Sequence, residues 1–327
     1  MLILGQEALK YGGRVVPLIL PIEELNGPTS TNVSVISING KLVVNIRNLN
    51  YFMYHADKTK NPHAWGPLLY IHPEADRTLT TYNYLCELDD SFNISAWSWI
   101  DTSQLDVKPI WEFIGLEDGR LIVWDNKFFI CGVRRDTTTN GVGRMELSEL
   151  EIKDKTVREI KRTRIPGPPP DNTYCEKNWM PIMDKPYHFV KWSNPTEVVQ
   201  FDPHTNQTRT VIQRDAVDLD LDTNDLRGGS QIIPYKNHYI CITHEVGLYQ
   251  TPTDRKDGFY WHRCVIWDRD FNLVRVSDPF TFMDGKIEFC VGLTEHGDDF
   301  IISFGFLDDA AYLIQIPKHR MDKILKL

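Results

Sequence analysis

The sequence has no long stretch in which apolar residues recur with the 3.6-residue period of an amphipathic helix. Apolar residues stand instead in short runs rich in Val, Ile, Phe, Tyr and Trp, separated by Asn, Asp, Gly and Lys. Such runs are typical of strands and hairpins. Only two short segments favour a helix, GQEALKY near the start and HRMDKILKL at the end. The sequence therefore predicts an all-β fold.

Closely spaced cysteines and nucleotide-binding glycine motifs are missing as well. The six cysteines include no C-x-x-C pair, which argues against a zinc knuckle. No Walker or G-x-G-x-x-G order occurs, so a Rossmann domain is not expected. The acidic run Asp215–Asp225 resembles a metal loop, but Thr223 and Gly229 stand where an EF-hand has Gly and Glu. We interpret it as a solvated connection, and we expect neither a metal site nor a cofactor.

Apolar runs long enough to cross a bilayer are also absent. The longest run after the start, VVPLILPI, is far shorter than the roughly 20 residues that a spanning helix needs. The opening MLILGQEALKYGG has no basic region before its apolar residues, unlike a secretory signal. We expect a cytoplasmic, reducing location without a membrane partner, in which NVS, NIS and NQT are not glycosylated.

An excess of positive charge is lacking too. Lys and Arg number 36 against 45 Asp and Glu, which gives a net charge of −9. A broad surface for duplex nucleic acid needs a basic patch, so such a partner is not expected. One small phosphate-binding pocket remains compatible with this charge.

One hairpin pattern occurs five times along the chain. Each copy has a small or polar start, an apolar strand, a turn containing Gly, Pro, Asn or Asp, and a second apolar strand. The copies are Asn32–Tyr51, Gly115–Gly141, Asn178–Trp192, Gly228–Glu245 and Phe289–Asp309. Five units of roughly 65 residues are long for four-stranded blades but leave room for insertions. The repeats predict a single domain over residues 1–327, a five-bladed β-propeller with a central axial pocket.

Charged residues mark both ends of the second hairpin. Glu117 and Asp118 open it, and Arg134 and Arg135 close it. In a propeller these ends face a shared pocket, because the inner strands surround one channel. The alternative is structural: Asp118 and Arg120 could tie neighbouring blades together by an ion pair.

Four of the hairpins also carry motifs that resemble glycoside hydrolase family 130, the five-bladed mannoside phosphorylases and mannosidases, and the related β-mannosyltransferases. GLEDGRL is similar to the G-x-E-D-P-R signature of this family, and EKNWMPI to its lysine-containing motif in the third blade. LRGGSQIIPYKNHYICITHE is similar to a Gly-rich turn followed by a strand that ends in His, and FIISFGFLDD to a last blade that ends in Y-G-x-x-D. Gly119 replaces the usual proline, and Thr243 precedes the His where an aromatic residue is common. These departures indicate a distant branch.

The resemblance implies inverting glycosyl transfer. Such a reaction needs an acid that protonates the leaving oxygen and a nucleophile on the opposite face of the sugar. In a phosphorylase phosphate is that nucleophile, so one protein carboxyl group is enough. The resemblance assigns the acid to Asp118, the second residue of the E-D pair; the alternative is an aspartate that only binds sugar hydroxyls.

Basic residues at the other strand ends suit a phosphate group, since arginine forks and other charge-assisted donors bind phosphate well. The expected phosphate-binding set is Arg134 or Arg135, Lys177 and His244, with only one of the two arginines facing inward because side chains alternate along a strand. His244 could equally be a structural histidine. The residues expected to bind the sugar are Asn32, Arg47, Glu117, Arg120, Trp179 and Asp308. Trp179 would stack on the sugar, unless it is a core residue.

Three functions are compatible with this pattern. The first is a mannose-type glycoside phosphorylase or glycosyltransferase that uses phosphate, a sugar phosphate or a nucleotide sugar. The second is a hydrolase of the same fold, in which the basic cluster would be expected to thin out. The third is a glycan-binding propeller without catalysis, which would not need Asp118.

Overall fold

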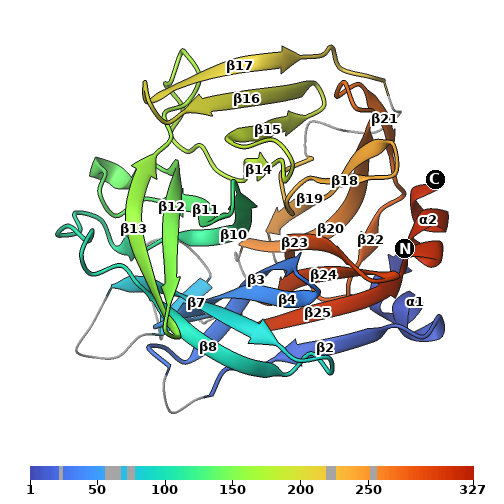
Figure 1. Cartoon of the computed structure of the whole chain (residues 1–327), viewed down its shortest axis with the longest axis horizontal. Coiled ribbons are helices and arrows are strands. Elements are labelled where there is room, and N and C mark those ends of the chain that lie inside the picture. The colour runs from blue at the N-terminus through green and yellow to red at the C-terminus, as the bar shows by residue number, and fades with distance from the viewer. Residues whose placement is uncertain (22–24, 56–67, 72–77, 219–225, 251–255) are drawn as a thin grey trace.

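The computed structural model describes residues 1–21, 25–55, 68–71, 78–218, 226–250 and 256–327. Strands make up most of the described chain, and their sheets form a ring when viewed down the shortest axis (Figure 1). The all-β, propeller-like fold predicted from the sequence is confirmed. Most of the acidic run Asp215–Asp225 lies outside the described residues.

Antiparallel pairing arranges most of the described strands in five groups of four, and one parallel strand pair joins the first two groups into a single sheet. The first group contains β3 (Thr29–Ile38), β4 (Lys41–Leu49), β7 (Leu79–Leu88) and β8 (Ile94–Asp101). The second contains β10 (Glu117–Trp124), β11 (Lys127–Arg134), β12 (Arg144–Lys153) and β13 (Thr156–Arg164). The third contains β14 (Met180–Pro181), β15 (His188–Ser193), β16 (Thr196–Asp202) and β17 (Gln207–Gln213).

The last two groups follow in the same order along the chain. The fourth contains β18 (Ile233–Tyr235), β19 (His238–Gln250), β20 (Lys256–Trp267) and β21 (Leu273–Val276). The fifth contains β23 (Glu288–His296), β24 (Asp299–Phe306), β25 (Ala310–Pro317) and, from the opposite end of the chain, β2 (Arg14–Leu18). The remaining elements are β1 (Leu2–Ile3), β5 (Phe52–His55), β6 (Leu68–Ile71), β9 (Phe113–Ile114), β22 (Phe280–Thr281), the 3-10 turn Thr139–Gly141, α1 (Leu4–Lys10) and α2 (Lys318–Leu325).

Each predicted hairpin forms the first two strands of one group, so all five are confirmed. Strands β3, β10 and β23 contact one another near the ring centre (Figure 1). The two predicted helices, α1 and α2, are also present and pack on the fourth and fifth groups. No described helix is long and apolar enough to cross a membrane.

The two ends of the chain meet in the fifth group. Strand β2 pairs antiparallel with β25, from Arg14 opposite Gln315 to Leu18 opposite Ala311. Strand β1 pairs with β22 beside the fourth group. The ring is therefore closed by backbone hydrogen bonds between β2, near the start of the chain, and β25, the last described strand (Figure 1).

Candidate active site

A pocket of about 230 Å³ lies where the five groups meet. We call it the axial pocket; its lining is Asn32, Arg47, Leu49, Tyr51, Phe113, Glu117, Asp118, Lys177, Asn178, His244, Tyr260, Ile287, Phe289 and Asp308. Each group, or the segment next to one of its inner strands, contributes at least one of these residues. The pocket thus brings together seven of the residues that the sequence analysis selected, from segments far apart in the chain.

The backbone aims several of these side chains. Asn32, Asp118, Asn178 and Asp308 have left-handed backbone conformations, with φ of 41°, 53°, 62° and 56°. Among residues other than glycine, Asn and Asp adopt this conformation most readily. The strand register also shifts at Asn32 and at Asp118, and such bulges re-aim a side chain. The choice of Asn and Asp here therefore serves the backbone as well as the chemistry of the site.

Asp118 is held at the pocket wall by two donors. Arg47 donates from Nη1 to Oδ1 of Asp118 over 2.8 Å, and Asn32 donates to the same oxygen over 2.7 Å. Burial raises the pKa of Asp118, but the positive charges of Arg47, Arg120 and Lys177 outweigh this effect. The pKa of Asp118 is therefore lowered, and the group is ionised at neutral pH in the free protein.

The second carboxyl group in the pocket, that of Asp308, behaves differently. Burial raises its pKa to about 6; Arg47 opposes the shift, and the negative charge of Asp118 adds to it. Two nearby carboxylates resist being charged together, so one takes the charge and the other holds a proton more readily. The axial pocket accordingly contains one firmly ionised carboxylate and one that titrates just below neutrality.

His244 of β19 lines the pocket from the fourth group. It is only 4% exposed, stacks on Tyr260 at 5.7 Å between ring centres, and meets Phe289 edge to face. Burial lowers its pKa well below the usual value, and His262 and Arg227 add to the shift. His244 is thus a neutral imidazole, able to donate one hydrogen bond without carrying charge.

Lys177 supplies the positive charge that remains available to a ligand. It is exposed at the pocket rim and forms no ion pair with any residue that the structure describes. Arg47, by contrast, is neutralised by Asp118 and by Glu117, whose Oε2 lies 3.5 Å from Nη2 of Arg47.

Neither of the two arginines predicted for phosphate binding lines the axial pocket. Arg134 is buried and paired with Asp136 at 3.0 Å and with Glu146 at 2.8 Å. Arg135 lies behind Glu117, with Nε 3.6 Å from its Oε1. Strand alternation was expected to turn one of the two arginines into the pocket, but neither lines it, and both lie against carboxylates of their own protein.

Two predicted sugar-binding residues lie below the pocket surface. Trp179 is fully buried in the core, where it contacts Phe189, so it offers no face for stacking. Arg120 is 1% exposed and donates to the backbone oxygens of Asp118 and Gly229. It ties the second group to the segment before β18, but no hydrogen bond or ion pair joins it to the carboxylate of Asp118 among the described contacts.

The sequence analysis did not select Asn178, Tyr260 and Tyr51, which also line the pocket. Asn178 directly follows Lys177 and, like Asn32, is an asparagine at the start of a repeat. This shared residue type could have identified Asn178 from the sequence. Tyr260 lies on β20, the third strand of its group, outside the repeated hairpin. No pattern within the hairpins could have found it.

No protein-family profile and no curated protein matches the sequence. Solved structures do match its fold. The β-1,2-mannobiose phosphorylase of Listeria innocua is 12% identical with a TM-score of 0.56, covering 96% of this chain and 97% of that one. A mannose phosphorylase of Leishmania mexicana, in complex with phosphate ion, is 11% identical with a TM-score of 0.52, covering 96% and 92%.

A third similar structure comes from work on the GH130 family of mannoside phosphorylases and its hydrolases that target β-1,2-mannosidic linkages in Candida mannan. It is 12% identical with a TM-score of 0.57, and the match covers 94% of each chain. The chain therefore resembles the GH130 mannoside phosphorylases in fold over nearly its whole length.

Proposed function

We propose that the chain is a carbohydrate-active enzyme that transfers a glycosyl group in the axial pocket, with phosphate or an activated sugar phosphate as the reaction partner. One observation supports this most. Asn32, Arg47, Asp118, Lys177, His244 and Asp308 converge on one pocket from segments far apart in the chain. The fold around that pocket resembles mannoside phosphorylases.

Asp118 is the proposed proton donor to the leaving oxygen of the sugar. In the free protein the group is ionised, because Arg47 and Lys177 lower its pKa. A phosphate bound at Lys177 would bring negative charge beside Asp118 and would weaken the effect of Lys177. Both changes raise the pKa of Asp118. Anion binding would thus favour the acid form just when the nucleophile is in place.

Lys177 and His244 are the proposed anion-binding residues. A lysine supplies full charge, and a neutral histidine adds one directed hydrogen bond. Asn32, Asn178 and Asp308 then remain for the sugar hydroxyls.

The direct test is incubation with β-1,2-mannobiose, with and without phosphate, and chromatography of the products. Phosphate-dependent release of mannose 1-phosphate is the expected result. A parallel thermal-shift series with phosphate, mannose 1-phosphate and nucleotide sugars identifies the donor, because a ligand that binds only the folded state raises the melting temperature. Neither product formation nor a shift with any of these compounds would contradict the proposal.

Hydrolysis is a second candidate, and Asp308 is the observation that favours it. Inverting hydrolases use two carboxyl groups, one as acid and one as base for water. Two carboxyl groups whose pKa values are pushed apart share this pocket. Release of free mannose at the same rate with and without phosphate would identify this reaction.

Lys177→Gln is expected to raise the KM for phosphate by about tenfold or more, with a smaller change in kcat, because one charge-assisted bond to the anion is lost. Folding should be unaffected, since Lys177 is exposed and forms no ion pair with the described residues. Phosphate saturation curves measure the effect. Lys161→Gln, an exposed lysine on β13, is the matched control. An unchanged KM in the Lys177 variant would place the anion elsewhere.

Binding of sulfate, an anion with constant charge near neutrality, is expected to weaken severalfold as the pH rises from 5 to 7. Below about pH 6 the carboxyl group of Asp308 is neutral, and above it the group is charged and repels the anion. The pKa values of Asp118 and His244 are both lowered, so we expect Asp308 to dominate the change. Calorimetric titration of wild type and Asp308→Asn measures the effect. A pH dependence that persists in Asp308→Asn would contradict the assignment.

A further inference from the structure

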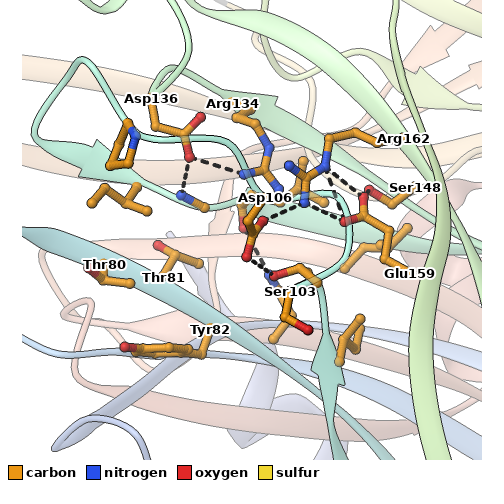
Figure 2. Close-up of a pocket in the computed structure, with 18 of the residues that line it drawn as sticks. Thr80, Thr81, Tyr82, Ser103, Asp106, Arg134, Asp136, Ser148, Glu159 and Arg162 are labelled. Atoms are coloured by element: carbon orange, nitrogen blue, oxygen red, sulfur yellow. Dashed lines mark hydrogen bonds and ion pairs between the residues drawn. The ribbon is translucent and has the colours of Figure 1, made fainter.

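A second cavity, of about 240 Å³, lies between the first and second groups (Figure 2). It shares no lining residue with the axial pocket. The chain segment from Phe113 to Asp118 separates the two: Ile114, Gly115 and Leu116 face the second cavity, whereas Phe113, Glu117 and Asp118 face the axial pocket.

The two arginines on one side of the second cavity are fully paired with carboxylates. Arg134 pairs with Asp136 and Glu146, as described above. Arg162 pairs with Glu159 at 2.5 Å and with Asp106 at 2.8 Å (Figure 2). Each guanidinium group thus has two carboxylate partners, so no positive charge is left over for an anionic ligand.

The facing side includes several hydroxyl-bearing side chains among apolar ones. Thr80, Thr81 and Tyr82 of β7 lie opposite the ion pairs, and Ser103 lies beside Asp106 (Figure 2). At the rim is Trp99 of β8, a large aromatic side chain that is 44% exposed. The cavity therefore combines hydrogen-bonding groups with a tryptophan side chain that is partly open to solvent.

One carboxylate oxygen at this cavity lacks a partner. Asp136 is 4% exposed, and its Oδ2 accepts hydrogen bonds from Arg134 and from the backbone N–H of Gly115. Its Oδ1 is buried without a hydrogen-bond partner among the described residues. A buried acceptor left unsatisfied costs folding free energy, so a donor from a ligand would be favoured there.

We infer that the second cavity binds a neutral polyhydroxylated ligand, a pyranose sugar. Sugar hydroxyls can donate to Asp136 and exchange hydrogen bonds with the threonine and serine hydroxyls. The apolar C–H face of a sugar ring can lie on Trp99, whose ring is amphipathic. The volume lies below the roughly 300–1,000 Å³ typical of sites for drug-sized ligands, which suits one or two sugar rings. This inference does not depend on the chemistry proposed for the axial pocket.

The test is calorimetric titration with methyl β-D-mannopyranoside and methyl β-D-glucopyranoside in phosphate-free buffer, in the Asp118→Asn background so that no turnover occurs. Trp99→Ala is expected to weaken binding at one site by about tenfold, the effect of losing one aromatic contact, and to leave any axial site unchanged. Trp192→Ala on β15, where Trp192 is 48% exposed, is the matched control and should change nothing.

Thr80→Val is a second variant that removes a hydroxyl from the facing side, and it should also weaken binding. A crystal soaked with the better glycoside should show the ring against Trp99. Titration curves that are identical in wild type, Trp99→Ala and Thr80→Val would overturn the inference. So would a cavity that takes up putrescine or phosphate but neither glycoside.

Discussion

Asp118→Asn is expected to fold normally, to bind sugar, and to lose about 10²–10⁴-fold in turnover, the usual contribution of general acid catalysis. Asn has the size of Asp, and its side-chain oxygen can still accept hydrogen bonds from Arg47 and Asn32. It cannot donate an acidic proton. Steady-state kinetics on the substrate identified by the product assay measures the loss.

The matched control is Asp308→Asn. If Asp308 only binds the sugar, this variant raises KM more than it lowers kcat. If Asp308 acts as the base for water, its kcat falls as far as that of Asp118→Asn. Near-wild-type turnover of Asp118→Asn, with unchanged sugar binding, would show that Asp118 is not the acid.

Arg47→Met is expected to destabilise the fold by about 3–5 kcal/mol, the usual effect of removing one partner of a buried ion pair. Arg47 is 6% exposed and is the cation between Asp118 and Glu117. Its loss leaves two partly buried carboxylates side by side without a positive charge to balance them. Urea unfolding, followed by tryptophan fluorescence, measures the change.

The double variant Arg47→Met with Asp118→Asn provides the internal control. Removing one of the two carboxylate charges should recover part of the lost stability, so the two effects are not additive. Equal unfolding midpoints for wild type and Arg47→Met would show that the ion pair contributes nothing to folding.

The repeated hairpins made the fold predictable. Apolar runs with turn residues between them are local features, and all five became the first two strands of a group. Strand ends that carry Asn32, Asp118, His244 and Asp308 then converge because the ring places them around one centre. The local hairpin pattern and its repetition were therefore enough to predict that these four residues lie close together.

Side-chain direction at Trp179 and Arg134 was not predictable in the same way. Trp179 packs against Phe189, and Arg134 is bound by Glu146 of β12 and by Asp136. Which partner a side chain meets depends on the neighbouring strand and its register, which the repeat does not encode. The opposite pKa shifts of Asp118 and Asp308 likewise depend on the position of Arg47, which reaches Asp118 from a different group of strands.

The pairing of β2 with β25 determines when the ring can be completed. About 300 residues separate the two strands along the chain, so β2 leaves the ribosome long before its partner exists. At roughly 5–20 residues per second, the wait lasts on the order of tens of seconds. Throughout that time the edges of the nascent sheets stay open to other chains. Pro17, which cannot donate a hydrogen bond, lies in β2 at the outer edge of the fifth group and limits such pairing.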